Sequence, residues 1–264
     1  MRQYSSYQSN PILAELYDLL PMHINRRDVP FYVEVCRQAN GPIVELGCGT
    51  GRVLIPVAEA GCSIFGVDSS ESMLRRCRKK VGKLTTEQQE RITLIEASMT
   101  AFSLPEQAAL AIIPFRAFQH IVSMDDQMAC LRAVHANLLP AGRLIFDLFQ
   151  VDPARLQASR HKTEVEDTPE FDLPDGRKLR RTNRLTDLHM AEQCNDVELI
   201  YYLTDIEDRT ERIVQSFPMR YFFRFEVEHL LARCGFAIDC IYGNFDRSEL
   251  ADNSPEMIFV ARKA

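Results

Sequence analysis

The chain has 264 residues, of which 46% are hydrophobic and 26% are charged. This composition is typical of a folded globular protein and excludes a disordered or fibrous one. A chain of this length buries roughly 70–75% of its unfolded surface, so its core needs no disulfide or metal. The formal net charge of −6 argues against a nucleic-acid partner, because binding a phosphate backbone requires a basic surface.

The first residues, MRQYSSYQSNP, are mostly polar and lack the apolar stretch of a signal peptide. No run approaches the roughly 18 apolar residues of a membrane-spanning helix. The eight cysteines stand singly, with no C-x-x-C spacing, which favours free buried thiols over disulfides or a zinc site. We therefore expect a cytoplasmic protein with no membrane contact and no metal.

The apolar pattern predicts two N-terminal helices, over 11–22 and 28–39. From residue 43 onward, short apolar runs alternate with amphipathic segments. The expected strands are 43–46, 63–68, 91–97, 109–115 and 143–149, and the expected helices are 52–61, 69–82 and 125–139. This alternation predicts a parallel sheet covered by helices on both faces.

The pattern changes after residue 149. Between 152 and 222, segments of alternating polarity are separated by turn signals such as Pro174-Asp175-Gly176, which predict an antiparallel meander of three or four strands. A helix over 223–235 and strands over 236–243 and 255–263 follow it. Because no linker or repeat separates these parts, we expect a single domain over 1–264, with the meander as an insertion.

A glycine-rich loop, Gly47-Cys48-Gly49-Thr50-Gly51, follows the first expected strand. Glycines let the backbone turn sharply there and bring a ligand close to the N-terminus of the next helix. Asp68 ends the second expected strand, where a carboxylate can accept hydrogen bonds from both hydroxyls of a ribose. Together these features predict a ligand that contains a nucleoside.

Three such ligands make different demands on the loop. A dinucleotide requires a third glycine where this chain has Arg52, and a P-loop requires a Gly-Lys-[Ser/Thr] sequence that the chain lacks. S-adenosylmethionine carries ribose and adenine but no phosphate, so it suits a loop without phosphate-binding features. Glu45, two residues before the loop, could face its ammonium group directly or through water.

Two stretches, ELGCGTG over 45–51 and VDSSESML over 67–74, resemble motifs I and II of the class I S-adenosylmethionine-dependent methyltransferases. The resemblance covers 41–150 and 223–263. It implies a Rossmann-like α/β fold, with a seven-stranded, mostly parallel sheet, helices on both faces and an antiparallel last strand. It also implies an N-terminal helical lid (1–40), a cofactor-binding core (41–150), an antiparallel β insertion after the fifth strand (151–222), and a C-terminal helix and strand pair (223–264).

The resemblance also implies which residues bind S-adenosylmethionine and its product, S-adenosylhomocysteine. These residues are Tyr17, Glu45, Gly47, Cys48, Gly49, Thr50, Gly51, Asp68, Ser69, Met73, Ser98, Met99 and Phe115. Ser98 departs from the family pattern, which has an acidic residue there that binds the adenine amino group. Simple packing is an alternative role for Met73 and Tyr17.

The segment after the fourth expected strand contains His120, the candidate general base, for which a structural role is the alternative. Candidate acceptor-lining residues are Phe118, Phe149, Arg220 and Tyr221. The segment lacks the [Asp/Asn]-Pro-Pro-[Tyr/Phe] sequence of enzymes that methylate amide or exocyclic amino nitrogens. We expect methyl transfer to an N or O atom of a small molecule. The alternatives are an RNA or protein acceptor, or a non-catalytic S-adenosylmethionine-binding module. The insertion is also a candidate homodimer surface.

Overall fold

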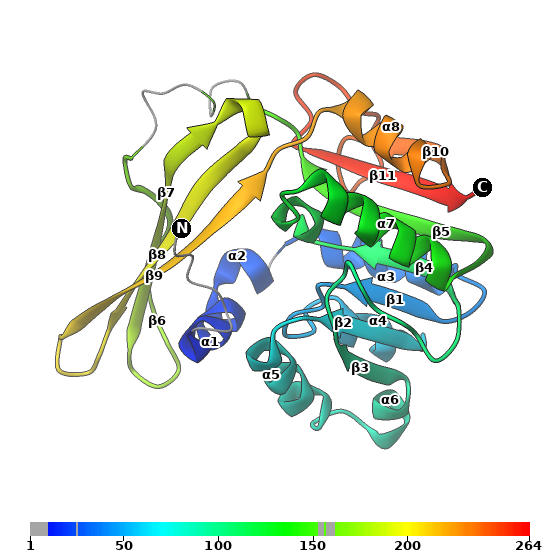
Figure 1. Cartoon of the computed structure of the whole chain (residues 1–264). Coiled ribbons are helices and arrows are strands. Elements are labelled where there is room, and N and C mark those ends of the chain that lie inside the picture. The colour runs from blue at the N-terminus through cyan, green and yellow to red at the C-terminus, as the bar shows by residue number, and fades with distance from the viewer. Residues whose placement is uncertain (1–9, 25, 153–155, 157–161) are drawn as a thin grey trace. The chain divides into compact units, whose positions relative to one another are not determined.

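The chain folds into two compact units in the computed structural model, which describes residues 10–24, 26–152, 156 and 162–264. The core unit comprises Arg26–Gln150 and Phe222–Ala264, and the insertion unit comprises Met1–Asn25 and Val151–Tyr221. Figure 1 shows their helices and strands in chain colours. The first 25 residues of the expected lid thus belong to the same unit as the expected β insertion, whereas residues 26–40 of that lid belong to the core unit.

The core unit is built on a seven-stranded sheet (Figure 1). Its strands, in spatial order, are β10 (Phe236–Tyr242), β11 (Glu256–Lys263), β5 (Leu138–Phe149), β4 (Ala108–Ile113), β1 (Ile43–Leu46), β2 (Ile64–Asp68) and β3 (Ile92–Glu96). β11 runs antiparallel to both of its neighbours, whereas β5, β4, β1, β2 and β3 pair in parallel. This confirms the expected Rossmann-like sheet and its antiparallel last strand.

Helices cover both faces of this sheet. Successive side chains of each strand point to opposite sides, and the strands present apolar side chains on both. Val44 and Leu46 of β1 pack in a cluster with α7 (Met124–Asn137) and α8 (Arg224–Arg233). Ile43 packs in a second cluster with α3 (Asp28–Arg37), α4 (Leu54–Glu59) and α5 (Glu71–Val81). The parallel strands are therefore buried on both faces, as their apolar sequences predict.

The insertion unit contains a four-stranded antiparallel sheet in which each strand pairs with the next in the chain. Its strands are β6 (Val165–Asp172), β7 (Lys178–His189), β8 (Cys194–Thr204) and β9 (Thr210–Arg220). Leucines of α1 (Pro11–Leu19) pack in one buried cluster with apolar residues of β7, β8 and β9. The predicted meander is confirmed, with four strands.

The prediction of one helix over 11–22 is wrong. α1 ends at Leu19, and a separate turn of helix, α2 (Pro21–Ile24), follows it. Leu20 is extended, with φ −74° and ψ 121°, because a proline at the next position disfavours the helical conformation of the residue before it. Sequence analysis also missed α6 (Thr86–Glu90) and the 3-10 helices η1 (Ala117–His120) and η4 (Met190–Glu192), which are too short to show a helical period.

None of the helices in the described ranges is long and apolar enough to cross a membrane. Within the same ranges, no cluster of three or more His, Cys, Asp or Glu side chains is arranged to hold a metal ion. All eight cysteines are free thiols.

Candidate functional site

The glycine loop joins β1 to α4 and adopts a conformation that only glycine accepts readily. Gly47, Gly49 and Gly51 have φ angles of 70°, 56° and 83°, in the left-handed region that disfavours other residues. A Cβ atom on Gly51 would lie 2.7 Å from the Cys77 Sγ atom. Side chains at these glycine positions would be strained or would clash, and their absence lets the loop backbone lie directly against a ligand.

Asp68 stands at the end of β2 and connects the loop to the start of α5. Its Oδ2 atom accepts a hydrogen bond from the Gly49 amide at 2.8 Å, and its Oδ1 atom accepts one from the Ser70 amide at 2.8 Å. Burial raises the pKa of Asp68, and the backbone donors oppose that rise. Asp68 thus ties the glycine loop to the turn that precedes α5.

Glu45 is a buried carboxylate with an unsatisfied oxygen. It lies on β1, its residue is 3% exposed, and its Oε2 atom has no hydrogen-bond partner among the described residues. Desolvation raises the pKa of Glu45 well above its usual range, and the Arg52 charge only partly opposes this. A buried carboxylate oxygen without a donor is costly, so the position fits a ligand that brings an ammonium group. S-adenosylmethionine carries one.

Two methionines border the loop. The Met73 Cε atom lies 3.3 Å from where a Gly49 Cβ would stand, and the Met99 Cε atom lies 3.5 Å from the corresponding point at Gly47. Ser98 is exposed, and its hydroxyl accepts a hydrogen bond from the Thr100 amide at 3.2 Å. Both methionines that the resemblance assigns to the cofactor are therefore at the loop, while the Ser98 hydroxyl stabilises a local turn.

The other loop residues are buried. Cys48 is 3% exposed, and desolvation raises the pKa of its thiol well above the usual range, so this thiol is held in its unreactive neutral form. Thr50 is fully buried, and the Lys80 Nζ atom lies 3.1 Å from its hydroxyl oxygen. Ser69 follows Asp68 directly at the start of α5.

The turn after β4 has an unusual backbone and a cationic environment. Phe115 and Arg116 are consecutive non-glycine residues with φ angles of 58° and 63°, a conformation that costs of order 1–3 kcal/mol per residue. The Phe115 ring centroid lies 4.9 Å from the Arg26 guanidinium carbon and 4.8 Å from that of Arg52. Cation–π attraction to these two arginines contributes to holding the ring in place.

Asp147 of β5 stabilises this turn through hydrogen bonds. Its Oδ1 atom accepts hydrogen bonds from the Phe115 amide at 2.8 Å and from the Tyr32 hydroxyl at 2.6 Å. Its Oδ2 atom lies 3.6 Å from Arg26 Nη2. Because Asp147 is completely buried, desolvation raises its pKa to about 6.

Two more carboxylates pair with the arginines around the turn. Asp28 receives two hydrogen bonds from Arg52, of 2.7 Å and 2.6 Å. Glu256, at the start of β11, accepts hydrogen bonds from both Arg26 and Arg116. The edge of the sheet where β1, β4 and β5 end therefore holds a buried network of alternating charges.

His120 lies at the end of η1, at the same edge of the sheet. Its side chain is exposed at the end of this helix. A neutral imidazole is the form that accepts a proton, and histidine is the side chain that most often serves as a general base near neutral pH.

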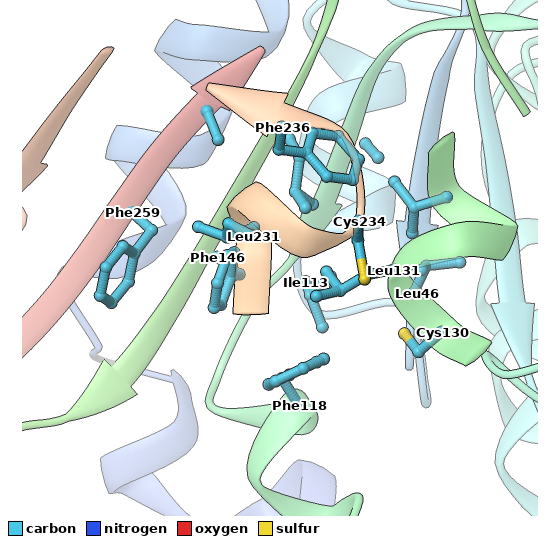
Figure 2. Packing of buried hydrophobic residues seen from close by; sticks show 14 of the residues in the cluster. Leu46, Ile113, Phe118, Cys130, Leu131, Phe146, Leu231, Cys234, Phe236 and Phe259 are labelled. Atoms are coloured by element: carbon cyan, nitrogen blue, oxygen red, sulfur yellow. The ribbon is translucent and has the colours of Figure 1, made fainter. Parts of the chain in front are cut away.

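The structure corrects the prediction that Phe118 lines the acceptor site. Its side chain is fully buried and packs against the Phe146 and Phe222 rings. Figure 2 shows it among the core residues of the sheet. η1 turns this ring toward the hydrophobic core, which leaves His120 as its exposed end.

The remaining predicted residues divide between the two units. Phe149 ends β5 in the core unit, and its ring lies under the Arg116 guanidinium. Tyr17, Arg220 and Tyr221 belong to the insertion unit. There the Tyr17 ring lies 4.3 Å from the His23 ring, and Arg220 Nη1 donates to the Glu192 carbonyl at 2.8 Å.

Sequence analysis missed most of the charged network. The missed residues are Arg26, Asp28, Tyr32, Arg116, Asp147 and Glu256. One signal was available, since Asp147 is a carboxylate inside the otherwise apolar strand sequence LIFDLF, and a buried charge needs partners. Glu256 joins the network because the sheet topology brings the start of β11 beside the end of β5.

The chain is similar to known methyltransferases. A family model described as a methyltransferase domain matches residues 43–142. A putative methyltransferase, YqeM, of Bacillus subtilis (strain 168) is 24% identical over 268 residues, covering 95% of this chain and 96% of that one.

Two solved structures have the same fold. The CcbJ methyltransferase from Streptomyces caelestis superposes with a TM-score of 0.76 at 20% identity, covering 100% of both chains. CalS10, an S-adenosylmethionine-bound amino pentose methyltransferase from Micromonospora echinaspora, superposes with a TM-score of 0.69 at 18% identity, covering 100% of this chain and 99% of that one.

Proposed function

Because this chain is a class I S-adenosylmethionine-dependent methyltransferase, we propose that it methylates an N or O atom of a small-molecule acceptor. CalS10, which shares its fold, acts on an amino pentose, and a structural relative from Streptoalloteichus is a sugar N-methyltransferase. An amino sugar or a similar polar metabolite is therefore the acceptor class to test first. An RNA or protein acceptor and a non-catalytic binding module are the alternatives.

The unpartnered Glu45 oxygen beside the glycine loop is the observation that carries the cofactor assignment. In this proposal Glu45 binds the ammonium group, and the loop backbone from Gly47 to Gly51 follows the methionine portion. Asp68 binds the ribose hydroxyls, with Ser69 and Met73 beside the adenine. Ser98 and Met99 contact the adenine from the end of β3, and Phe115 and Tyr17 close the methionine side.

S-adenosylmethionine supplies a methyl group on a sulfonium that is already activated, so the protein's main task is to align the two reactants and exclude water. His120 then accepts the proton of the acceptor hydroxyl or ammonium. The imidazole is exposed at the end of η1, and its neutral form is the one that accepts a proton. Phe149, Arg220 and Tyr221 are proposed to contact the acceptor, and the insertion sheet is the proposed surface for a homodimer.

Binding of S-adenosylhomocysteine tests the cofactor assignment. At about 100 times its dissociation constant, the ligand should stabilise the fold by roughly 2.7 kcal/mol and raise the melting temperature by roughly 5–10 °C. NADH should have no effect. Asp68→Ala should abolish the shift, while Asp239→Ala, which removes only a surface pair with Arg262, should retain it. A shift with NADH alone would refute the assignment.

An acceptor screen tests the reaction. We expect methyl transfer to amino or hydroxyl groups of small polar molecules and none to tRNA or peptides. His120→Gln should lower kcat by about 100-fold while the affinity for S-adenosylhomocysteine stays the same. Ligand binding without any product would favour the non-catalytic module. An unchanged kcat in His120→Gln would assign the histidine a structural role.

A further inference from the structure

The chain passes between its two compact units at three places, next to Arg26, after Gln150 and before Phe222. On the core side, residues at each of these places contact the segment from Phe115 to His120. These contacts come from different parts of the sequence and lie wholly within the core unit. The same short segment ends in the candidate base, His120.

Arg26, at the first connection, is linked to the segment by a carboxylate that both Arg26 and Arg116 bind. Arg26 Nη2 donates to Glu256 Oε1 at 3.0 Å, and Arg116 Nε donates to Glu256 Oε2 at 3.2 Å. Arg116 Nη2 also donates to the same Oε1 atom. Glu256 is 4% exposed, so both arginines hold it in a site with little water, where charge-assisted hydrogen bonds are strong.

The second connection reaches the segment through Phe149, the residue before Gln150. The Phe149 amide donates to the Gln119 Oε1 atom at 2.8 Å, and Gln119 is 1% exposed. The Arg116 guanidinium carbon lies 3.4 Å from the Phe149 ring centroid. Arg116 therefore contacts both the first and the second connection with one side chain.

The third connection reaches the segment through apolar packing. The Phe222 and Phe118 rings have centroids 5.6 Å apart, and both side chains are fully buried. Close-packed rings transmit displacement because the interior has few voids to absorb it.

The backbone conformation of Phe115 and Arg116 also depends on the contacts of this segment. Phe115 and Arg116 occupy left-handed conformations that persist only where surrounding contacts outweigh their cost. Those contacts are the Asp147 hydrogen bond to the Phe115 amide and the Arg116 interactions described above. Loss of the Arg116 contacts should let the turn relax toward a commoner conformation.

We propose that Arg116 is a positioning residue that ties the segment ending in His120 to the first two chain connections, so that the conformation of these connections sets the placement of the base. This role rests on the proposed function, because it assumes that His120 serves methyl transfer. Arg116 acts through the turn and through Glu256 and Phe149. It needs no contact with the acceptor.

Hydrogen–deuterium exchange of the full chain, together with kinetics, tests this role. Arg116→Lys keeps the charge but loses the planar group that bridges Glu256 and stacks on Phe149. We expect amide exchange to rise about tenfold at 115–121 and also at the two connections that Arg116 contacts, near 26–28 and 148–150, and to rise less near 222–224, which packs on Phe118. Phe149→Leu should reproduce part of this rise in exchange. Phe149→Tyr, which keeps an aromatic ring, should leave exchange at the wild-type level. Arg262→Met, which removes a surface pair in the same unit, is the control.

The kinetic readout separates positioning from general damage. Arg116→Lys should lower kcat by roughly tenfold or more through misplacement of the base, with the affinity for S-adenosylhomocysteine unchanged. Exchange that rises only at 115–121, or nowhere, would overturn the proposal. So would a normal kcat in a variant whose exchange has risen. A wild-type chain that binds cofactor but methylates nothing would instead overturn the proposed function, while the exchange pattern would still decide the coupling.

Discussion

The two compact units use polar groups in opposite ways. In the core unit, parallel strands are apolar on both faces, and charged side chains gather in one buried network where the strands end. In the insertion unit, consecutive antiparallel strands carry many arginine–carboxylate pairs that are largely exposed, such as Arg212 with Glu164. Buried charge is costly unless it is paired, so the core network depends on its pairing more strongly than the exposed pairs of the insertion do.

The largest expected effect lies in the glycine loop and compares two glycines of the core unit. Gly51→Ala should destabilise the fold by about 2–4 kcal/mol, because the new Cβ would meet Cys77 and φ is 83°. Gly61 has φ 93° but no atom within 4 Å of the Cβ position, so Gly61→Ala should cost only about 1 kcal/mol. Urea unfolding measures both. Equal costs would show that the close approach at the loop has no energetic weight.

The second prediction concerns the buried network and its pH dependence. The pKa of Asp147 is about 6 in the folded chain, against an ordinary value of 3.8. A raised carboxyl pKa means that the folded state is favoured by protonation, so this contribution is complete below pH 4 and is lost as the pH rises through 6. The stability of the wild type relative to Asp147→Asn should therefore fall by about 3 kcal/mol between pH 4 and 7.

Urea unfolding of both proteins across this pH range measures that difference, and the subtraction cancels groups common to the two. The asparagine can accept the same hydrogen bonds from Tyr32 and the Phe115 amide through its Oδ1 atom. A difference that does not change with pH would mean that Asp147 titrates normally.

A third prediction tests a well-buried arginine of the insertion unit and its carboxylate partner. Arg181 is 3% exposed and donates two hydrogen bonds to Asp167, of 2.9 Å and 3.1 Å. Arg181→Met should destabilise the fold by about 2–3 kcal/mol. Arg212→Met, at the exposed pair with Glu164, should cost less than about 1 kcal/mol. Similar losses in both variants, measured by urea unfolding, would contradict the comparison between buried and exposed pairs.

The smallest expected effect concerns Ser98, where the chain departs from the family pattern. Ser98→Asp should tighten S-adenosylhomocysteine binding by about fivefold, because a carboxylate can accept a hydrogen bond from the adenine amino group. Ser98→Ala should leave the affinity nearly unchanged, since the serine hydroxyl serves the Thr100 turn. Isothermal titration measures both. Unaltered affinity in Ser98→Asp would mean that adenine does not lie against this position.

The elements of the core unit were predictable to within a few residues because their signals are local. β1 over Ile43–Leu46 matches its prediction residue for residue, since a short apolar run between Gly-Pro and a glycine loop admits little else. The break between α1 and α2 was missed, although Pro21 disfavours a helical conformation at the residue before it and so could have predicted the break. η1 was not readable, because its first neighbour Arg116 adopts a left-handed conformation that no local sequence signal requires.

The candidate site divides in the same way. Asp68 and the glycine loop are close in sequence to the strands that place them, so spacing alone predicted their meeting, and the Gly49–Asp68 hydrogen bond bears this out. Phe118 was predicted to line the acceptor site because it lies in the segment after the fourth expected strand, beside the candidate residues Phe115 and His120. Whether a ring on a 3-10 helix faces solvent or core depends on packing against Phe146 and Phe222, which lie far away in the chain.

The sequence by itself determined the alternating architecture, the antiparallel insertion, the glycine loop and the resemblance to a methyltransferase family, because each depends on patterns within about thirty residues. Only the tertiary structure decided that residues 26, 116, 147 and 256 share one buried charge network. It also decided that α1 and α2 share one compact unit with the insertion, while α3 belongs to the core unit. The physical reason is that buried charges choose partners by proximity in the folded chain, where burial makes an unpaired charge costly, and sequence separation has no part in that choice.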